Sequence, residues 1–160
     1  ALFFACLPLT GCGGAGAGPA PALSSAAPSP LALAVYQQAN AVRLAEGLDP
    51  LLWHAEAAEV AGRHAVQMMA QQRLAHIDVH GLDPGQRLDA AGITVRAWGE
   101  NLAQGSADAR AIVAGWLASP EHRANLLEPR FQYMGIGVAG SGSDTWCTQL
   151  LLTLPENLPQ

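Results

Sequence analysis

Three side chains in separate segments have chemistry that suits metal binding or proton transfer. His76 begins the segment HIDVH, Glu100 lies in WGENLAQG, and His122 lies in GWLASPEHRANLL. Two imidazoles and one carboxylate are sufficient ligands for a zinc ion with one open position. Sequence alone does not bring the three together, so this candidate site depends on the elements that carry them.

His122 is expected in the first turn of a helix. Ser119 is a typical N-cap residue, and Pro120 fits the first helical position. His122 then lies third, where free backbone amides and the helix dipole disfavour a charged imidazolium. A neutral imidazole with a free lone pair suits metal ligation or proton acceptance. The same residues are also consistent with a plain capped helix start.

Glu100 lies close to an aromatic residue in sequence, two positions after Trp98. Such a carboxylate is partly desolvated, which disfavours its charged form unless a cation or a hydrogen-bond donor meets it. Asn101 either orients Glu100 or satisfies loop backbone, and we favour the second role.

The remaining histidines have simpler interpretations. His54 and His64 fall in or beside a predicted helix and are interpreted as packed or solvated residues. His76 and His80 bracket a segment whose following Gly and Asp-Pro-Gly indicate a loop, and His80 is expected to be exposed. The pair is not the helical zinc-protease motif, which needs Glu directly after the first His.

Arg123, beside His122, either holds a carboxylate, Glu128 or Asp89, or is a solvated helix charge. The tryptophans are interpreted as core and groove wall rather than as a cofactor site. They are Trp53, Trp98, Trp116 and Trp146.

Apolar spacing and turn residues predict the elements that position these side chains. The predicted helices cover about 33–46, 55–72, 86–91 and 108–118, with another starting after Ser119; LDPLLW is a turn, 94–105 is a strand or extended, and 133–153 is a hairpin. Helices first, strands last and a helix between favour an α+β or three-layer arrangement over regular βαβ units.

Composition limits the function. The chain has 160 residues, enough for one domain, and 50% of them are hydrophobic. Its formal net charge is -5, and all eight basic residues are arginines that form no basic stripe. A nucleic-acid partner is therefore not expected.

The N-terminal segment ALFFACLPLTGC has the length of a signal-peptide core and is too short to span a bilayer. Its last four residues resemble the bacterial lipobox, which implies lipid attachment at Cys12; the alternative is an ordinary buried or cleaved cysteine. We expect a truncated signal peptide over 1–11, the lipidated cysteine and a Gly, Ala, Pro and Ser linker over 12–32, and the folded domain over 33–160.

The cysteines predict export without disulfides. Cys6 leaves with the signal peptide and Cys12 carries the lipid, so Cys147 has no partner. In DTWCTQLLLT, Cys147 is interpreted as a small apolar strand residue rather than a nucleophile.

Five segments, LAHI, WGENLAQG, GWLASPEHRANLL, MGIGVA and WCTQ, occur in an order that resembles the CAP superfamily of cysteine-rich secretory, antigen 5 and plant pathogenesis-related proteins. The likeness is to its bacterial SCP-like branch and covers about Leu33 to Leu154. It implies an α-β-α sandwich whose central groove is lined in many members by two histidines and two glutamates.

Carried over by motif, the resemblance places three of those four groove residues at His76, Glu100 and His122. The second glutamate falls on Ser119. Glu121 is not expected to replace it, because adjacent helical residues point about 100° apart. The resemblance therefore implies a groove triad that is a candidate zinc site.

Three functions follow as hypotheses. The first is a membrane-anchored lipoprotein in the periplasm or on the surface of a bacterium, which binds a lipid-like or cell-envelope ligand in its groove without catalysis. The second is a zinc-dependent hydrolase or protease with a metal-bound water as nucleophile. No general base is evident for it once Glu100 is a ligand. The third is a structural envelope interaction protein.

Overall fold

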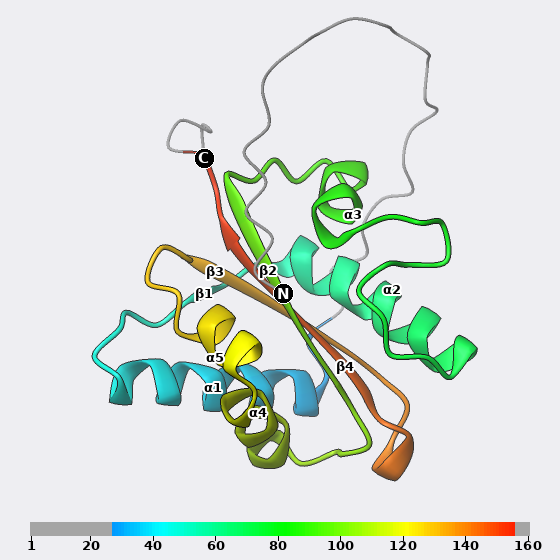
Figure 1. The fold of residues 1–160 in the computed structure, drawn as a ribbon, viewed down its shortest axis with the longest axis horizontal. Helices are drawn as coiled ribbons and strands as arrows, with labels where there is room; N and C mark the ends of the chain where they lie inside the picture. The colour runs from blue at the N-terminus through cyan, green and yellow to red at the C-terminus, as the bar shows by residue number, and fades with distance from the viewer. Residues whose placement is uncertain (1–26, 156–160) are drawn as a thin grey trace, which may run out of the picture.

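The computed structural model describes residues 27–155 (Figure 1). Its elements in chain order are α1 (Pro30–Ala45), β1 (Leu52–Trp53), α2 (Ala55–Gln71), α3 (Pro84–Ala90), β2 (Ala97–Gln104), α4 (Ala109–Ala118), α5 (Pro120–Leu126), β3 (Tyr133–Ala139), a 3-10 turn (Gly142–Asp144) and β4 (Trp146–Thr153). The expected signal peptide, Cys12 and the first part of the expected linker lie outside the described residues.

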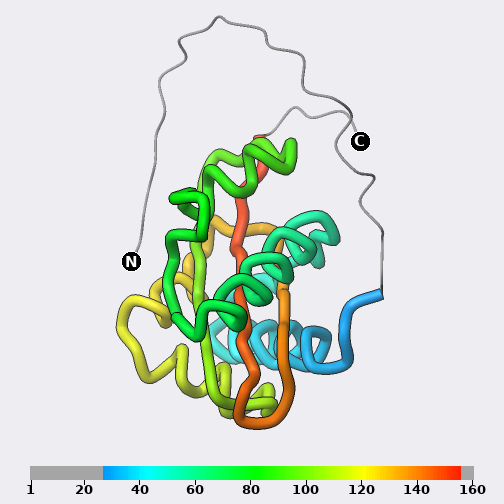
Figure 2. Tube along the Cα trace, turned by 90° about the vertical axis from the view of Figure 1, so that its right-hand side faces the viewer, coloured from blue at the N-terminus to red at the C-terminus, as the bar shows by residue number. Residues whose placement is uncertain are grey.

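The four strands form one sheet in the order β1-β3-β4-β2. β3 and β4 are the predicted hairpin, and β2 pairs antiparallel with β4 along its whole length. In Figure 2, β2, β4 and β3 lie side by side in that order. β1 was not predicted, because two residues are too few to show an alternating pattern; it pairs parallel to β3 within the segment expected to be a turn. β2 is an edge strand, so residues from both faces of the sheet can approach it.

Helices cover both faces of the sheet. α1, α4 and α5 pack together on one face, where Val35, Trp116 and Leu126 belong to one buried cluster. α2 and α3 cover the other face, where Ala57, Val60 and Leu88 pack with strand residues. The predicted α+β, three-layer α-β-α sandwich is confirmed.

The prediction that the tryptophans belong to the core is confirmed. Trp116 and Trp146 are fully buried, Trp98 is nearly so, and Trp53 is partly buried against the first cluster.

Two helices begin earlier than the sequence predicts. α1 starts at Pro30 instead of position 33, because the Ser29 side chain accepts a hydrogen bond from the Ala32 N–H and Pro30 takes the first position. Positions 30–32 therefore belong to the helix rather than to the expected linker. α3 starts at Pro84 because Asp83 and Gln86 form a capping box.

α2 lies directly against β3, without intervening side chains at two glycines. A Cβ atom placed on Gly137 would collide with the backbone nitrogen of Gly62, and one on Gly135 would collide with that of Ala58. Glycine at both positions thus sets the distance between the helix and the sheet.

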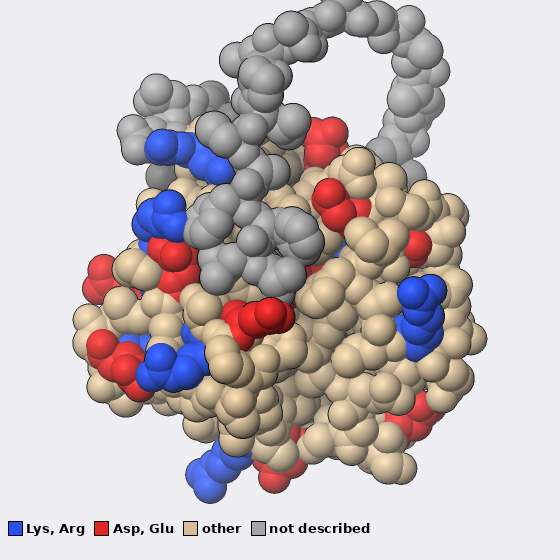
Figure 3. Space-filling view, viewed as in Figure 1, with Lys and Arg blue, Asp and Glu red and all other residues tan. Residues whose placement is uncertain are grey.

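Arginine and acidic side chains are interspersed on the face shown in Figure 3, amid a mostly uncharged surface. On this face the arginines do not gather into one stripe. Within residues 27–155, every helix is too short or too polar to cross a membrane.

Candidate functional site

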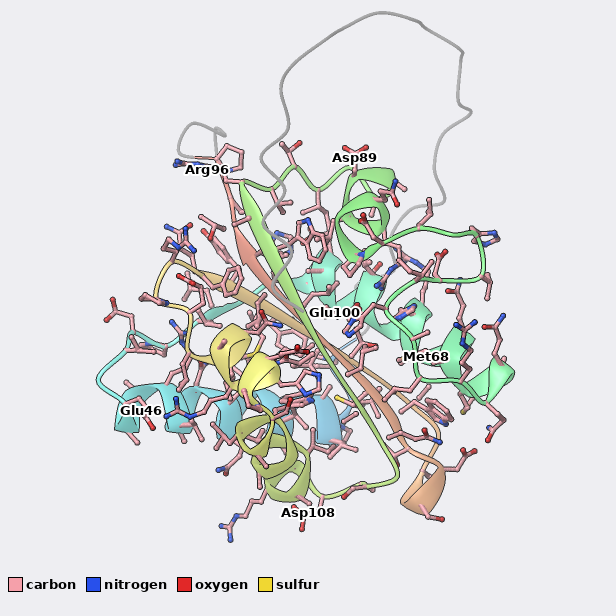
Figure 4. All side chains as sticks on the ribbon, viewed as in Figure 1. Glu46, Met68, Asp89, Arg96, Glu100 and Asp108 are labelled. Atoms are coloured by element: carbon pink, nitrogen blue, oxygen red, sulfur yellow. The ribbon has the colours of Figure 1, made fainter. Side chains whose placement is uncertain are left out.

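β2 carries the centre of the site, with successive side chains on opposite faces. Trp98 and Leu102 pack in clusters with residues of α2. Glu100, between them, points to the same face, whereas Asn101 contacts α5 on the other. Figure 4 shows Glu100 near the middle of β2, between α5 and the segment that links α2 to α3.

Glu100 and His76 form a direct pair. The Nδ1 atom of His76 lies 2.8 Å from Oε1 of Glu100. The Glu100 side chain is only 1% exposed, while that of His76 is 36% exposed. When Nδ1–H donates to the carboxylate, the Nε2 atom of a neutral His76 remains available as an acceptor.

Arg87 provides the cation that a buried carboxylate requires. Its Nη2 atom lies 2.6 Å from Oε2 of Glu100, and its side chain is 6% exposed. The same Nη2 atom donates to the carbonyl oxygen of His76 at 3.1 Å. Arg87 therefore holds both members of the pair. Sequence reasoning missed this residue, because the only signal was one arginine in a short predicted helix.

The loop that carries His76 is fixed at two further points. His64 of α2 is buried, the first of the two alternatives left by the sequence, and bonds through Nε2 to the carbonyl oxygen of Ala75 at 2.8 Å. Burial lowers the pKa of His64, and the nearby positive charge of Arg87 adds to this effect. Asp78 Oδ1 accepts the backbone N–H groups of His80 and Leu82 in a turn. His80 is exposed, as predicted.

His122 is the third residue of α5 and is half-buried. Its pKa is lowered, chiefly by burial and further by the nearby imidazole of His76. The neutral imidazole expected from the sequence is thus supported, but burial rather than the helix terminus is the main cause. Ser119 is the N-cap residue of α5, as predicted, but its side chain makes no capping hydrogen bond. The turn is held by Pro120 and by the Arg123 N–H donating to the Ser119 carbonyl.

Asn101, on the face of β2 that contacts α5, bonds the backbone of His122. Its Nδ2 atom donates to the carbonyl oxygen of His122 at 3.1 Å and to Oε1 of Gln149 at 2.9 Å. We predicted that Asn101 bonds a backbone group of a loop rather than orienting Glu100. It does bond a backbone group, but that group, the His122 carbonyl, belongs to helix α5 and not to a loop.

Arg123 contacts neither of the two carboxylates proposed from the sequence. Its Nη2 atom lies 3.2 Å from Oε1 of Glu46, and both side chains are about half exposed. The pairings with Glu128 and Asp89 are therefore wrong. α5 turns Arg123 outward toward the end of α1, whereas Glu128 bonds Arg130.

A small cavity borders His122. It has a volume of about 240 Å³ and lies between β2 and α4. Its lining is mostly apolar, with Leu102, Ile112 and Trp116 as the large residues. Gly115 of α4 also lines it, and a Cβ atom at Gly115 would meet no atom within 4 Å.

The donor set fits zinc poorly as arranged. Within residues 27–155, no group of three or more His, Cys, Asp or Glu side chains is positioned to hold a metal ion. Glu100 uses one oxygen for His76 and the other for Arg87, which makes it a partner of the histidine rather than a third ligand. His76 and His122 remain as donors, one fewer than the three protein ligands usual in catalytic zinc sites. The zinc site stays a prediction that can be tested.

The model of the cysteine-rich secretory protein family, CAP, matches residues 36–151, which include the whole site. This chain belongs to the CAP family. Its CAP domain is 30% identical over 117 residues to the uncharacterized protein YkwD of Bacillus subtilis, and 33% identical over 99 residues to the uncharacterized membrane protein YlbC of the same organism. These alignments cover 73% and 62% of the chain, but only 45% and 29% of the relatives. The chain thus spans less than half the length of either relative.

Solved structures have the same fold. An extracellular SCP-domain protein of Bacillus anthracis has a TM-score of 0.70 at 28% identity, over 77% of this chain and 40% of its own. An outer surface protein of Borrelia burgdorferi has a TM-score of 0.74 at 20% identity, over 79% of this chain and 95% of its own. The second likeness concerns the fold alone.

Proposed function

We propose that this CAP domain is a non-enzymatic binding module for an amphipathic ligand, lipid-like or another cell-envelope component, in the groove over β2 between His76 and His122. The observation that carries the proposal is the apolar cavity that ends on the neutral, half-buried imidazole of His122. Such a site combines an apolar wall with one polar group that fixes orientation.

The loop beside the groove adds apolar surface. It exposes Leu74, Ile77 and Val79 by 47%, 53% and 44% on either side of His76. Clustered exposed aliphatic side chains are typical of interaction sites. An amphipathic ligand would bury this surface while its polar group bonds to the imidazoles.

The proposed location is outside the cytoplasm. It is supported by similar proteins described as extracellular, as an outer surface protein and as a membrane protein. We further propose that Cys12 carries a lipid anchor and that the preceding residues are its signal peptide. Cys12→Ser should move the protein from the membrane fraction to the soluble fraction of cells. Unchanged fractionation of this variant would contradict the proposed lipid anchor.

Filling the cavity tests the binding proposal directly. Gly115→Leu places a side chain in the cavity from a helical position with space for it. Gly62→Leu is the matched control, since Gly62 is also helical, lies on α2 and has no atom within 4 Å of a Cβ. Displacement of a fluorescent long-chain fatty acid, measured with chelator present, reports binding. Gly115→Leu should weaken it at least about tenfold and Gly62→Leu should leave it unchanged.

Other results favour the alternatives. If the parent protein binds neither the fatty acid nor purified envelope material, and His76→Ala and His122→Ala lose stability, the structural hypothesis is preferred. Hydrolysis that a chelator abolishes would support the zinc enzyme. Such an enzyme would also need a general base, and both oxygens of Glu100 are already bonded, to His76 and to Arg87.

A further inference from the structure

We propose that Arg87 is a specificity-determining residue that keeps divalent metal ions off Glu100, so that the groove works without a metal. This proposal concerns the same groove as the proposed function but does not depend on which ligand binds there.

The first argument is geometric. Zinc binds a carboxylate oxygen at about 2.0–2.2 Å. The Arg87 Nη2 atom already lies 2.6 Å from Oε2 of Glu100, and Oε1 is bonded to His76. A metal ion on either oxygen would have to displace one of these partners.

The second argument is electrostatic. A zinc ion on Glu100 would lie within a few ångströms of the Arg87 guanidinium, which stays protonated in proteins. Both side chains are almost fully buried, so solvent screens this repulsion only weakly. Like charges placed together in this way weaken binding of the metal ion.

The third argument is that Arg87 is held in place. Nη2 bonds both the Glu100 carboxylate and the His76 carbonyl oxygen. If Arg87 moved away, it would leave the Glu100 carboxylate buried without its cation, which is strongly destabilising. Zinc binding would have to offset this cost as well.

Removal of Arg87 should therefore create the metal site that the parent lacks. Without the guanidinium, Oε2 of Glu100 would lose its ion pair and could bind a metal ion together with the imidazole of His76, which already contacts Oε1 of the same carboxylate.

The test is calorimetric titration of zinc chloride into the full 160-residue chain, with Cys6→Ser and Cys12→Ser present to remove thiols that bind zinc. Arg87→Met should bind zinc at least about tenfold more tightly than the parent. Arg87→Lys keeps a positive charge and should behave as the parent does. Arg63→Met is the control, because Arg63 forms an exposed pair with Glu59 on α2. Adding His76→Ala to Arg87→Met should remove the gain.

Two results would overturn the proposal. One is zinc binding by the parent that is lost in His76→Ala, since Arg87 would then fail to exclude the metal. The other is a folded Arg87→Met protein, checked by circular dichroism, with no gain in affinity. If Arg87→Met does not fold, titrations of the parent and of His76→Ala still test whether the parent binds zinc through His76. Zinc is titrated in the absence of fatty acid. A negative result for Arg87 can therefore be told apart from a negative result for the proposed binding of an amphipathic ligand.

Discussion

A single amide group of Asn125 in α5 bonds both Glu100 and Asn101 in β2. Its Nδ2 atom lies 3.1 Å from the carbonyl oxygen of Glu100 and 3.0 Å from Oδ1 of Asn101. All three residues are at most 1% exposed. The asparagine in HRAN and the Glu-Asn pair in GENL are therefore one buried network, which holds α5 and its His122 against the edge strand.

We expect Asn125→Ala to destabilise the domain by about 2 kcal/mol or more. The substitution leaves two buried acceptors without a donor, and each such group costs about 1–3 kcal/mol. Urea unfolding followed by circular dichroism measures the change. Gln37→Ala removes an exposed amide from α1 and should stay within about 0.5 kcal/mol of the parent. Equal stability of the two variants would show that the Asn125 network contributes little.

Gly137→Ala and Gly62→Ala should have opposite effects, although the two glycines face each other. A methyl group at Gly137 would collide with the α2 backbone, and such overpacking costs about 1–3 kcal/mol. The Gly62 position has space and lies within a helix, where alanine is favoured over glycine by about 1 kcal/mol. Thermal unfolding of both variants checks the signs. A stable Gly137→Ala protein would mean that α2 can move away from β3.

Protonation of His54 should lower the stability of the domain at mildly acidic pH. Its Nδ1 atom accepts the Ala57 N–H at the start of α2, which requires the unprotonated nitrogen. Burial lowers the pKa of His54 in the folded protein, although Glu56 opposes this. The unfolded chain, with a pKa of about 6.5, binds more protons as the pH falls. The contribution of His54 to the free energy of unfolding is therefore complete above about pH 6.5. It declines as the pH falls from there toward the pKa of His54 in the folded protein.

His54→Asn isolates this effect, because asparagine is a good N-cap residue that does not titrate. Between pH 7.5 and 5.5, its urea midpoint should fall less than that of the parent. His64 and His122 titrate in both proteins, so only the difference between the two reports on His54. An identical fall would argue against the predicted role of the cap.

Cys147 should be inert in the folded protein. Its thiol is fully buried in β4, and burial raises its pKa to about 12. In a Cys6→Ser, Cys12→Ser protein, an aromatic disulfide reagent should react with Cys147 only after denaturant is added. Rapid reaction without denaturant would contradict the buried-strand interpretation.

The sequence predicted those parts of the fold that have a local signal. The hairpin over 133–153 has a Gly-Ser-Asp turn, and α2 has a continuous apolar face. The helix of His122 was placed correctly because Pro120 marks its start. Residue chemistry selected Glu100, His76 and His122, and the resemblance placed them in one groove; His76 and Glu100 are indeed in contact.

Long-range contacts were not predictable in the same way. Arg87 bonds a residue 13 positions away in another element, and no periodicity shows which arginine of the chain will be buried. Neither carboxylate considered for Arg123 is its partner for the same reason, because Glu46 lies 77 positions away; the alternative of an exposed helix charge is closer to what the structure shows. Such pairs depend on how helices pack across the sheet, which is decided by the whole core.

His76 lies in the segment between α2 and α3, and His122 lies on α5, so the two histidines belong to helical layers on opposite faces of the sheet. A molecule that bonds both imidazoles would therefore link these two layers. Its binding energy would oppose separation of the layers, because the ligand is lost when they part. Occupancy of the groove should then be measurable far from any chemistry, as slower hydrogen exchange of the β2 amides.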